Sequence, residues 1–161
     1  MHPRAAELIC LLDLEPHPEG GYYRRIHRSE SRVLREADGT RRRALTSIYY
    51  LLTEGSLSRW HRVLADEAWH HYEGAPLELL GFAADVPHNF LHRLGPLQEG
   101  GSPAYVVPAG WWQAARPLGA YSLVGCTVGP GFEFEDFTLL ADLPEEERPA
   151  YPSFLDFALF L

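Results

Sequence analysis

The feature of this sequence that most restricts its fold is a regular succession of short runs rich in aromatic and β-branched residues. Glycine and proline turns separate the runs, as at Gly129-Pro130-Gly131. Several short strands at even spacing, with no helices between them, are typical of a β-sandwich or β-barrel. The sequence therefore predicts an all-β domain. Its predicted strands cover residues 46–52, 57–63, 67–72, 77–82, 89–94, 104–107, 111–115, 121–128 and 132–140.

The two ends of the chain have a different character. Residues 4–14 carry apolar side chains at helical spacing, and Pro16 follows, so a short N-terminal helix is predicted there. The tail, residues 143–161, begins with an acidic turn and ends in the apolar run 154–161. An exposed run of that kind would form an apolar surface patch that promotes aggregation, so we expect it to pack on the barrel or on a second subunit. The chain is then one domain, 1–161, with a barrel core at about 20–140.

Length and composition agree with a single packed domain. The chain has 161 residues, of which 46 % are hydrophobic. Its two cysteines, Cys10 and Cys126, form no Cys-x-x-Cys pair and indicate thiols in a reducing compartment. No apolar run approaches the ~18 residues of a membrane span, and no secretion signal opens the chain. We therefore expect a cytoplasmic protein without a membrane partner.

The charge is unevenly distributed. The net charge is −8, yet all 14 basic residues are arginines and many of them lie in residues 24–43. Glu30, Glu36 and Asp38 interrupt this cluster, and an acidic chain repels phosphate backbones. We expect no nucleic-acid partner and interpret the cluster as a solvated loop or a dimer interface.

Two motifs carry the chemistry. The first has the spacing Gly-x5-His-x-Val-x3-Glu-x6-Gly, and the second is Pro-Ala-Gly-Trp-Trp-Gln at residues 108–113. They resemble the two motifs of the cupin superfamily, with Val63 and Gln113 in the places of two histidines. The residues that match the first motif are Gly55, His61, Glu67 and Gly74.

Over residues 8 to about 140, the chain resembles one branch of the superfamily, known as a cupin domain of unknown function. The matching residues include His17-Pro18-Glu19-Gly20-Gly21-Tyr22-Tyr23. The resemblance implies a double-stranded β-helix (jelly roll), usually dimeric, with the motif side chains inside the barrel. It supplies no reaction, because fold alone does not give function. This chain has Arg25 where the family usually carries an acidic residue, which would make the ligand more anionic.

This chain keeps fewer of the metal-ligating residues that are typical of cupins. Cupin enzymes hold iron or manganese with imidazoles and a carboxylate. Here His61 and Glu67 remain, Val63 cannot ligate, and Gln113 offers only an amide oxygen. These three polar residues are the candidate metal ligands, and we expect an organic ligand rather than a tightly bound divalent metal. His70 would join them only if a β-bulge near Ala68 turned it inward.

The predicted function is small-molecule binding in a pocket centred on His61, Glu67 and Gln113. By strand alternation, Trp69 and Trp111 should line it, with His70 and Arg25 as further ligand contacts. Three alternatives stay open. The His–Glu pair could be a mutually satisfied core pair. A metal-independent epimerase or isomerase acting on a sugar-nucleotide-like substrate would use His61 as acid or base, with Glu67 fixing its tautomer and raising its pKa. A metal-dependent enzyme would use the reduced His/Glu/Gln site.

Overall fold

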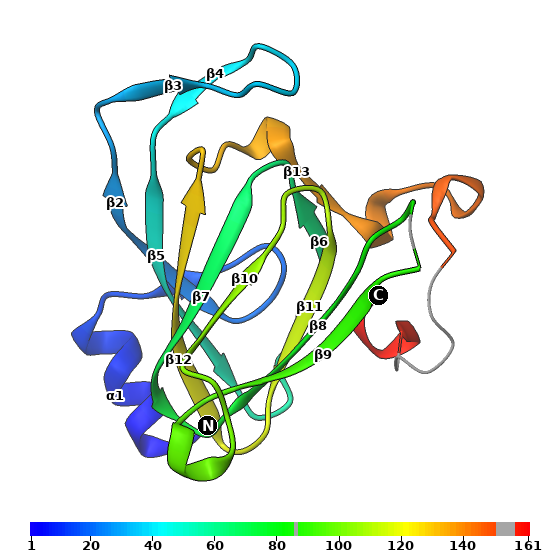
Figure 1. The fold of residues 1–161 in the computed structure, drawn as a ribbon. Coiled ribbons are helices and arrows are strands. Elements are labelled where there is room, and N and C mark those ends of the chain that lie inside the picture. The colour runs from blue at the N-terminus through cyan, green and yellow to red at the C-terminus, as the bar shows by residue number, and fades with distance from the viewer. Residues whose placement is uncertain (86, 151–156) are drawn as a thin grey trace.

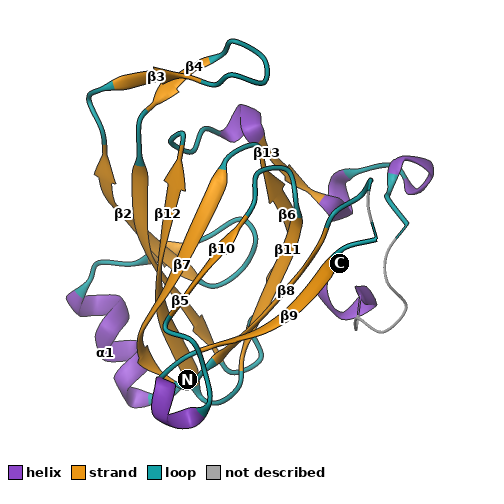
Figure 2. Cartoon of the chain, in the orientation of Figure 1, coloured by secondary structure: helices purple, strands orange, loops and turns teal. Residues whose placement is uncertain are grey.

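The structure is a computed structural model that describes residues 1–85, 87–150 and 157–161. Its backbone is mostly antiparallel β-strand, with one short helix, α1 (Pro3–Leu11), at the N-terminus (Figures 1 and 2). The strands are β1 (Glu15–Pro16), β2 (Tyr22–Arg28), β3 (Arg32–Leu34), β4 (Arg41–Arg43), β5 (Thr46–Thr53), β6 (Ser58–Val63), β7 (Asp66–Gly74), β8 (Leu77–Phe82), β9 (Asn89–Leu94), β10 (Ala104–Val107), β11 (Trp112–Pro117), β12 (Tyr121–Gly129) and β13 (Phe137–Leu139).

Two sheets face each other and enclose the interior. One has the strand order β1-β2-β5-β12-β7-β10, and the other has the order β13-β6-β11-β8-β9. Several neighbours in each sheet are far apart in sequence, as in the pairing of β5 with β12 and of β6 with β11. Two packed antiparallel sheets with such crossovers form a jelly roll, so the predicted all-β fold class is confirmed.

The interior is filled unevenly along the barrel. Large apolar side chains pack its middle, where alternate residues of each strand point inward. That cluster includes Tyr50, Trp69, Leu79 and Val124, each almost fully buried. The inward-facing side chains one layer further along include polar ones, with Glu67 on β7 and Thr46 on β5, on either side of Val128 on β12. The packed layer therefore forms the floor of a more polar end of the barrel.

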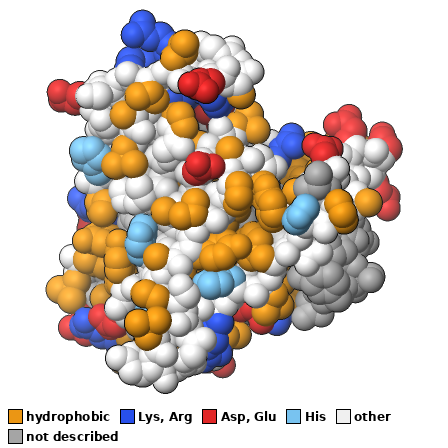
Figure 3. Space-filling model, in the orientation of Figure 1, with side chains coloured by type: hydrophobic (Ala, Val, Ile, Leu, Met, Phe, Trp, Pro, Cys, Tyr) orange, Lys and Arg blue, Asp and Glu red, His pale blue; other side chains and the backbone are white. Residues whose placement is uncertain are grey.

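The arginine-rich stretch is not the loop that its composition suggested. Residues Tyr22–Arg28 form β2, which pairs with β5, and β3 and β4 form a hairpin that projects from the barrel (Figure 1). Several arginines are neutralised within the chain. Arg42 pairs with Asp136 over 2.7 Å, and Arg28 pairs with Glu133 over 2.5 Å. Charges of both signs are therefore interspersed around the hairpin (Figure 3).

The prediction of a strand over residues 132–140 is mostly wrong. Phe134–Asp136 forms a 3₁₀ turn, and only Phe137–Leu139 is a strand. Side-chain contacts hold this segment instead of a continuous ladder of backbone hydrogen bonds. Asp136 is paired by two arginines, and the ring of Phe132 packs edge-on against Phe134 and Phe137. A loop thus replaces a strand at the polar end of the barrel.

Both chain ends pack on the barrel. Helix α1 begins at Pro3, is capped by the His2 side chain and buries Ala5 and Leu8. It ends at Leu11, three residues before the predicted end. In the tail, Phe157 and Phe160 pack on Trp60, which confirms packing for that part of the run. Residues 154–156 of the predicted apolar run lie outside the described residues. None of the helices in the described part of the chain has the length and hydropathy of a membrane-spanning segment.

Candidate functional site

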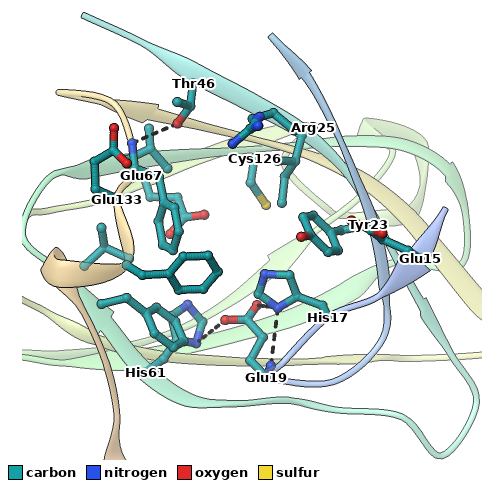
Figure 4. A pocket seen from close by; sticks show the side chains of 16 residues that line it. Glu15, His17, Glu19, Tyr23, Arg25, Thr46, His61, Glu67, Cys126 and Glu133 are labelled. Carbon is teal, nitrogen blue, oxygen red and sulfur yellow. Dashed lines mark hydrogen bonds and ion pairs between the residues drawn. The ribbon is translucent and has the colours of Figure 1, made fainter. Parts of the chain in front are cut away.

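A cavity of about 180 Å³ opens at the polar end of the barrel, between the two sheets (Figure 4). Its interior wall carries buried titratable side chains, and its mouth carries exposed ones. The residues that line it are Glu15, His17, Glu19, Tyr23, Arg25, Thr46, Ile48, His61, Val63, Glu67, Cys126, Val128, Phe132, Glu133, Phe134 and Phe137.

His61 lies on β6 in the interior wall and is 2 % exposed. Its Nδ1 atom is 2.8 Å from the carbonyl oxygen of Arg59 and 3.1 Å from Oε2 of Glu19. Both neighbours are acceptors, so Nδ1 carries the proton and Nε2 keeps a lone pair. Burial lowers the pKa of His61, although the nearby Glu67 opposes that shift. His61 is therefore a neutral imidazole that offers one basic nitrogen.

Glu67 lies at the start of β7 and is 7 % exposed. Its Oε2 atom accepts a hydrogen bond of 2.6 Å from the Gln113 side chain. Burial raises the pKa of Glu67 to about 7; His61 opposes this shift and Glu19 adds to it. A carboxyl group with this pKa takes up and releases a proton near neutral pH, as a general acid or base must.

Gln113 supports Glu67 rather than facing the cavity. Its Oε1 atom accepts a hydrogen bond of 2.9 Å from the Trp69 indole, and its Nε2 atom donates to Glu67. Gln113 and Trp69 are each 1 % exposed, and neither lines the cavity. Both point inward as predicted, but the Trp69 ring belongs to the packed floor one layer below. The indole and amide thus fix the carboxyl group from behind.

Glu19 is the site residue that the sequence reasoning missed. Its Oε1 atom accepts a hydrogen bond of 3.0 Å from Ser58, and its Oε2 atom contacts His61. The expected role of Glu67 in fixing the His61 tautomer therefore belongs to Glu19 and the Arg59 carbonyl. The expected rise in the His61 pKa is also wrong, because desolvation outweighs the attraction of Glu67. Burial raises the pKa of Glu19 as well.

The glycine after Glu19 explains how this loop reaches the site. Gly20 has φ of +113°, and a Cβ atom built there would lie 2.0 Å from the Leu57 carbonyl oxygen. Its own carbonyl accepts a hydrogen bond of 2.7 Å from Tyr50. Only glycine allows this conformation and this close approach. The available signal was the position of Glu19 inside the stretch 17–23, which carried the family resemblance.

His17 extends the polar cluster toward the mouth. Its Nδ1 atom accepts a hydrogen bond of 3.3 Å from the Glu19 backbone and lies 3.8 Å from the Glu19 carboxylate (Figure 4). Because Nδ1 is the acceptor in the first contact, it cannot donate to the carboxylate. Burial lowers the pKa of His17, so this imidazole is neutral too. The cavity wall therefore presents two neutral imidazoles and two carboxyl groups.

Of the other residues predicted to contact a ligand, one lies at the cavity and two do not. Arg25 is exposed and lines the mouth. His70 follows Trp69 on β7 and so faces the opposite side of the sheet, and the irregular pairing of β7 with β12 lies beyond it, near Tyr72 rather than Ala68. Trp111 precedes β11 and stacks on a ring outside the cavity. His70 and Trp111 are thus not part of the cavity wall.

The donor set does not fit the metal that cupin enzymes hold. Val63 lines the cavity where a second histidine would stand, and both ends of the Gln113 amide are engaged by Trp69 and Glu67. The described residues contain no cluster of three or more His, Cys, Asp or Glu side chains with geometry for a metal ion. His61 and Glu67 alone make a weak site for a divalent cation.

Comparison with known proteins agrees with the architecture. The model of the family described as Cupin superfamily (DUF985) matches residues 6–140. A hypothetical protein from Leishmania major is similar, with 36 % identity and a TM-score of 0.78, over 83 % of this chain and 85 % of that one. A protein from Shewanella oneidensis is similar, with 37 % identity and a TM-score of 0.74, over 84 % of this chain and 83 % of that one.

More distant structures share only the fold. Oxalate decarboxylase from Bacillus subtilis has 17 % identity and a TM-score of 0.59, over 84 % of this chain and 33 % of that one. No curated protein sequence is significantly similar to this chain. The family match covers most of the chain and includes His61, Glu67 and Gln113. The chain therefore belongs to the cupin superfamily, in the family of unknown function DUF985.

Proposed function

We propose that the cavity binds a small polar organic molecule and that His61 and Glu67 exchange protons with it. One observation carries this proposal. The two buried side chains line one cavity, and each is held from behind: His61 through Nδ1, and Glu67 through Oε2. Among the described residues, His61 Nε2 has no hydrogen-bond partner, and the Glu67 carboxyl group is contacted only by Gln113 and the Cys126 thiol, so both groups can still contact a ligand. A lone pair and a carboxyl proton in one enclosed space are the parts of a general base and a general acid.

The size of the cavity favours a ligand with a single ring. Its volume of about 180 Å³ is a little larger than the ~150 Å³ cavity that holds benzene. A monosaccharide or a compound of similar size therefore fits, whereas the nucleotide part of a sugar nucleotide would have to lie outside. We propose an isomerase-type proton transfer over hydrolysis, because the described wall supplies an acid and a base, whereas burial raises the pKa of its one thiol, Cys126, and keeps it protonated.

The experiment follows both binding and proton exchange. Pools of single-ring sugars, sugar acids and hydroxy acids are incubated with the protein in D₂O. The His61 imidazole resonance reports binding, and mass spectrometry reports deuterium at carbon. We expect a ligand that shifts the His61 resonance of the wild type and gains deuterium with the wild type, but gains none with His61→Ala or Glu67→Gln. His70→Ala is the matched control, because His70 faces the other side of the sheet, and it should exchange normally.

Each outcome separates the candidate functions. Binding without deuterium uptake would support the second candidate, a non-catalytic binding module, and would remove the acid–base role. If no compound in the pools shifts the His61 resonance, the cavity is a polar part of the core and the proposal fails. Exchange that survives both substitutions in the cavity would place the reacting groups elsewhere.

We also propose that the protein is a homodimer, as the family resemblance implies. The projecting hairpin supports this, because a two-stranded hairpin is marginal by itself. It exposes Leu34 at 61 % and Val33 at 38 %, and Ile26 on β2 is also exposed. Light scattering after size exclusion should give the mass of a dimer for the wild type. Leu34→Glu should lower it, and a monomeric wild type would contradict the assignment.

A further inference from the structure

The charged side chains at the mouth of the cavity are not equally satisfied. The Glu133 carboxylate is paired with Arg28 over 2.5 Å, and the Glu15 carboxylate is hydrogen-bonded by the Tyr23 hydroxyl. Arg25 lines the same mouth, yet within the described ranges it makes no hydrogen bond and no ion pair. A guanidinium group carries donors in a fixed fork. The mouth therefore has one cation whose donors are free for a ligand.

Strand alternation directs this cation toward the cavity. On β2, Tyr23 and Arg25 line the cavity, whereas Arg24 between them pairs with Asp13 outside. Arg25 lies opposite Ile48 on β5, which is also a lining residue. Figure 4 shows the Arg25 side chain and the His61 imidazole on opposite sides of the space. A ligand in the cavity would therefore have its inner end at His61 and its outer end at Arg25.

We infer that Arg25 forms a subsite for a carboxylate group of the ligand, at the opposite end of the cavity from His61 and Glu67. This inference rests on the proposed function of the cavity. It narrows the ligand to a hydroxy or keto acid with one ring or a chain of similar length. The hydroxyl or carbonyl end would face the interior acid–base pair, and the carboxylate would form paired hydrogen bonds with the guanidinium group.

The surrounding charges favour a carboxylate over a phosphate. Among the described residues of the lining, Arg25 is the one cation without an ion pair, and Glu15 and Glu133 line the same mouth. A dianionic phosphate would meet two carboxylates and only one free positive charge, whereas a monoanionic carboxylate matches the charge and the geometry of one guanidinium. The interior wall is neutral or acidic, with His61 and Glu19 in contact, so it does not attract a second anionic group.

Matched pairs of small molecules test the subsite. Glucuronate is compared with glucuronamide, tetrahydropyran-2-carboxylate with its primary amide, and benzoate with benzamide. Saturation-transfer NMR at millimolar concentration measures binding, and the His61 imidazole resonance shows whether a compound enters the cavity. We expect the carboxylates to bind more tightly than their amides. Arg25→Gln should weaken carboxylate binding by about tenfold or more, with little effect on the amides.

Arg24→Gln is the control for this substitution, because Arg24 is the neighbouring arginine and points away from the cavity. Arg24→Gln should not change the binding of carboxylates or of amides, and Arg25→Lys should keep part of the preference for carboxylates. Carboxylates and amides that bind equally, with a shifted His61 resonance, would overturn the subsite and leave the proposed function intact. A preference that survives Arg25→Gln would also overturn it. If neither class shifts the His61 resonance, the proposed function and this inference fail together.

Discussion

Glu19 Oε2 lies 3.1 Å from His61 Nδ1, and the Arg59 carbonyl oxygen lies 2.8 Å from the same nitrogen. Two acceptors thus converge on one ring atom of a buried imidazole. The other nitrogen, Nε2, makes no hydrogen bond among the described residues and is the atom that we propose contacts a ligand. The orientation of the one cupin-motif histidine in this chain is therefore set by a loop residue outside the cupin motifs.

This arrangement predicts the tautomer of His61. In the wild type, ¹⁵N chemical shifts of the imidazole should show a proton on Nδ1 and none on Nε2 at neutral pH, because only Nδ1 faces acceptors. Glu19→Ala should keep that tautomer, since the Arg59 carbonyl remains, but should cost about 1–3 kcal/mol of stability by leaving Ser58 without its acceptor. His61→Gln identifies the resonance. A proton on Nε2 in the wild type would contradict the assignment.

The Trp69–Gln113–Glu67 chain should behave as one unit. Gln113→Leu leaves a buried indole N–H and a buried carboxyl group without their partners, so we expect a loss of about 2–4 kcal/mol in the free energy of unfolding. Urea unfolding measures it. Trp69→Phe removes one hydrogen bond and should cost less.

The double variant Trp69→Phe/Gln113→Leu then tests the coupling. Its loss in the free energy of unfolding should be smaller than the sum of the losses of the two single variants by at least about 0.5 kcal/mol, as expected for residues in one network. Strict additivity would mean that the two hydrogen bonds do not act together. Leu91→Ala is a control, because Leu91 is exposed on β9 and its loss should be small.

The raised pKa of Glu67 predicts a pH dependence of stability with a definite sign. Between the ordinary pKa of 4.5 and the folded value of about 7, the folded state binds more protons than the unfolded state. Stability from this group is therefore present at low pH and is lost as the pH rises through about 7. Glu67→Gln removes the effect, so the wild type should lose up to about 3 kcal/mol relative to the variant from pH 4.5 to pH 8.

Comparing the wild type with Glu67→Gln at each pH isolates this group. The lowered pKa values of His17 and His61 act in the opposite direction below pH 6.5; the His17 contribution is present in both proteins, whereas Glu67→Gln also removes the attraction that partly opposes the His61 shift. Glu73 is a useful contrast, because its side-chain hydrogen bond with Arg4 lowers the pKa of the Glu73 carboxyl group to about 2. Its contribution is present above pH 4.5 and is lost as the pH falls toward 2. A stability difference that does not change with pH would show that Glu67 titrates normally.

The donor set predicts weak metal binding that two substitutions should repair. Elemental analysis of untagged wild-type protein should find well below one Fe, Mn or Zn per chain, because Gln113 is engaged and Val63 has no donor. Val63→His combined with Gln113→His should then bind one Mn²⁺ per chain, since it restores three imidazoles beside Glu67. Calorimetry measures both proteins. Stoichiometric metal in the wild type would contradict this account.

Much of the fold could be predicted because it depends on local pattern. The strands Leu77–Phe82, Asn89–Leu94 and Ala104–Val107 begin and end where the alternation of apolar residues and the turn residues indicate. Strand β2 was missed because its charged residues are exposed and β1 covers only its first two residues, so composition says little about its backbone pairing. The segment at 132–136 was predicted wrongly because aromatic residues favour strands in general, whereas here they lie in a loop that forms part of the cavity wall.

The sequence by itself determined an all-β domain, because strands and turns leave a local pattern, and its resemblance to the cupin motifs implied a jelly roll with His61 and Glu67 inside it. Only the tertiary structure decided what these two groups face. It brought Glu19 across from a loop more than forty residues earlier to fix the His61 ring, and it turned Gln113 back toward Trp69. Hydrogen bonds between distant segments depend on how the sheets pack, and no spacing along the chain encodes them. The cavity, its neutral imidazoles and the position of Arg25 at its mouth follow from that packing.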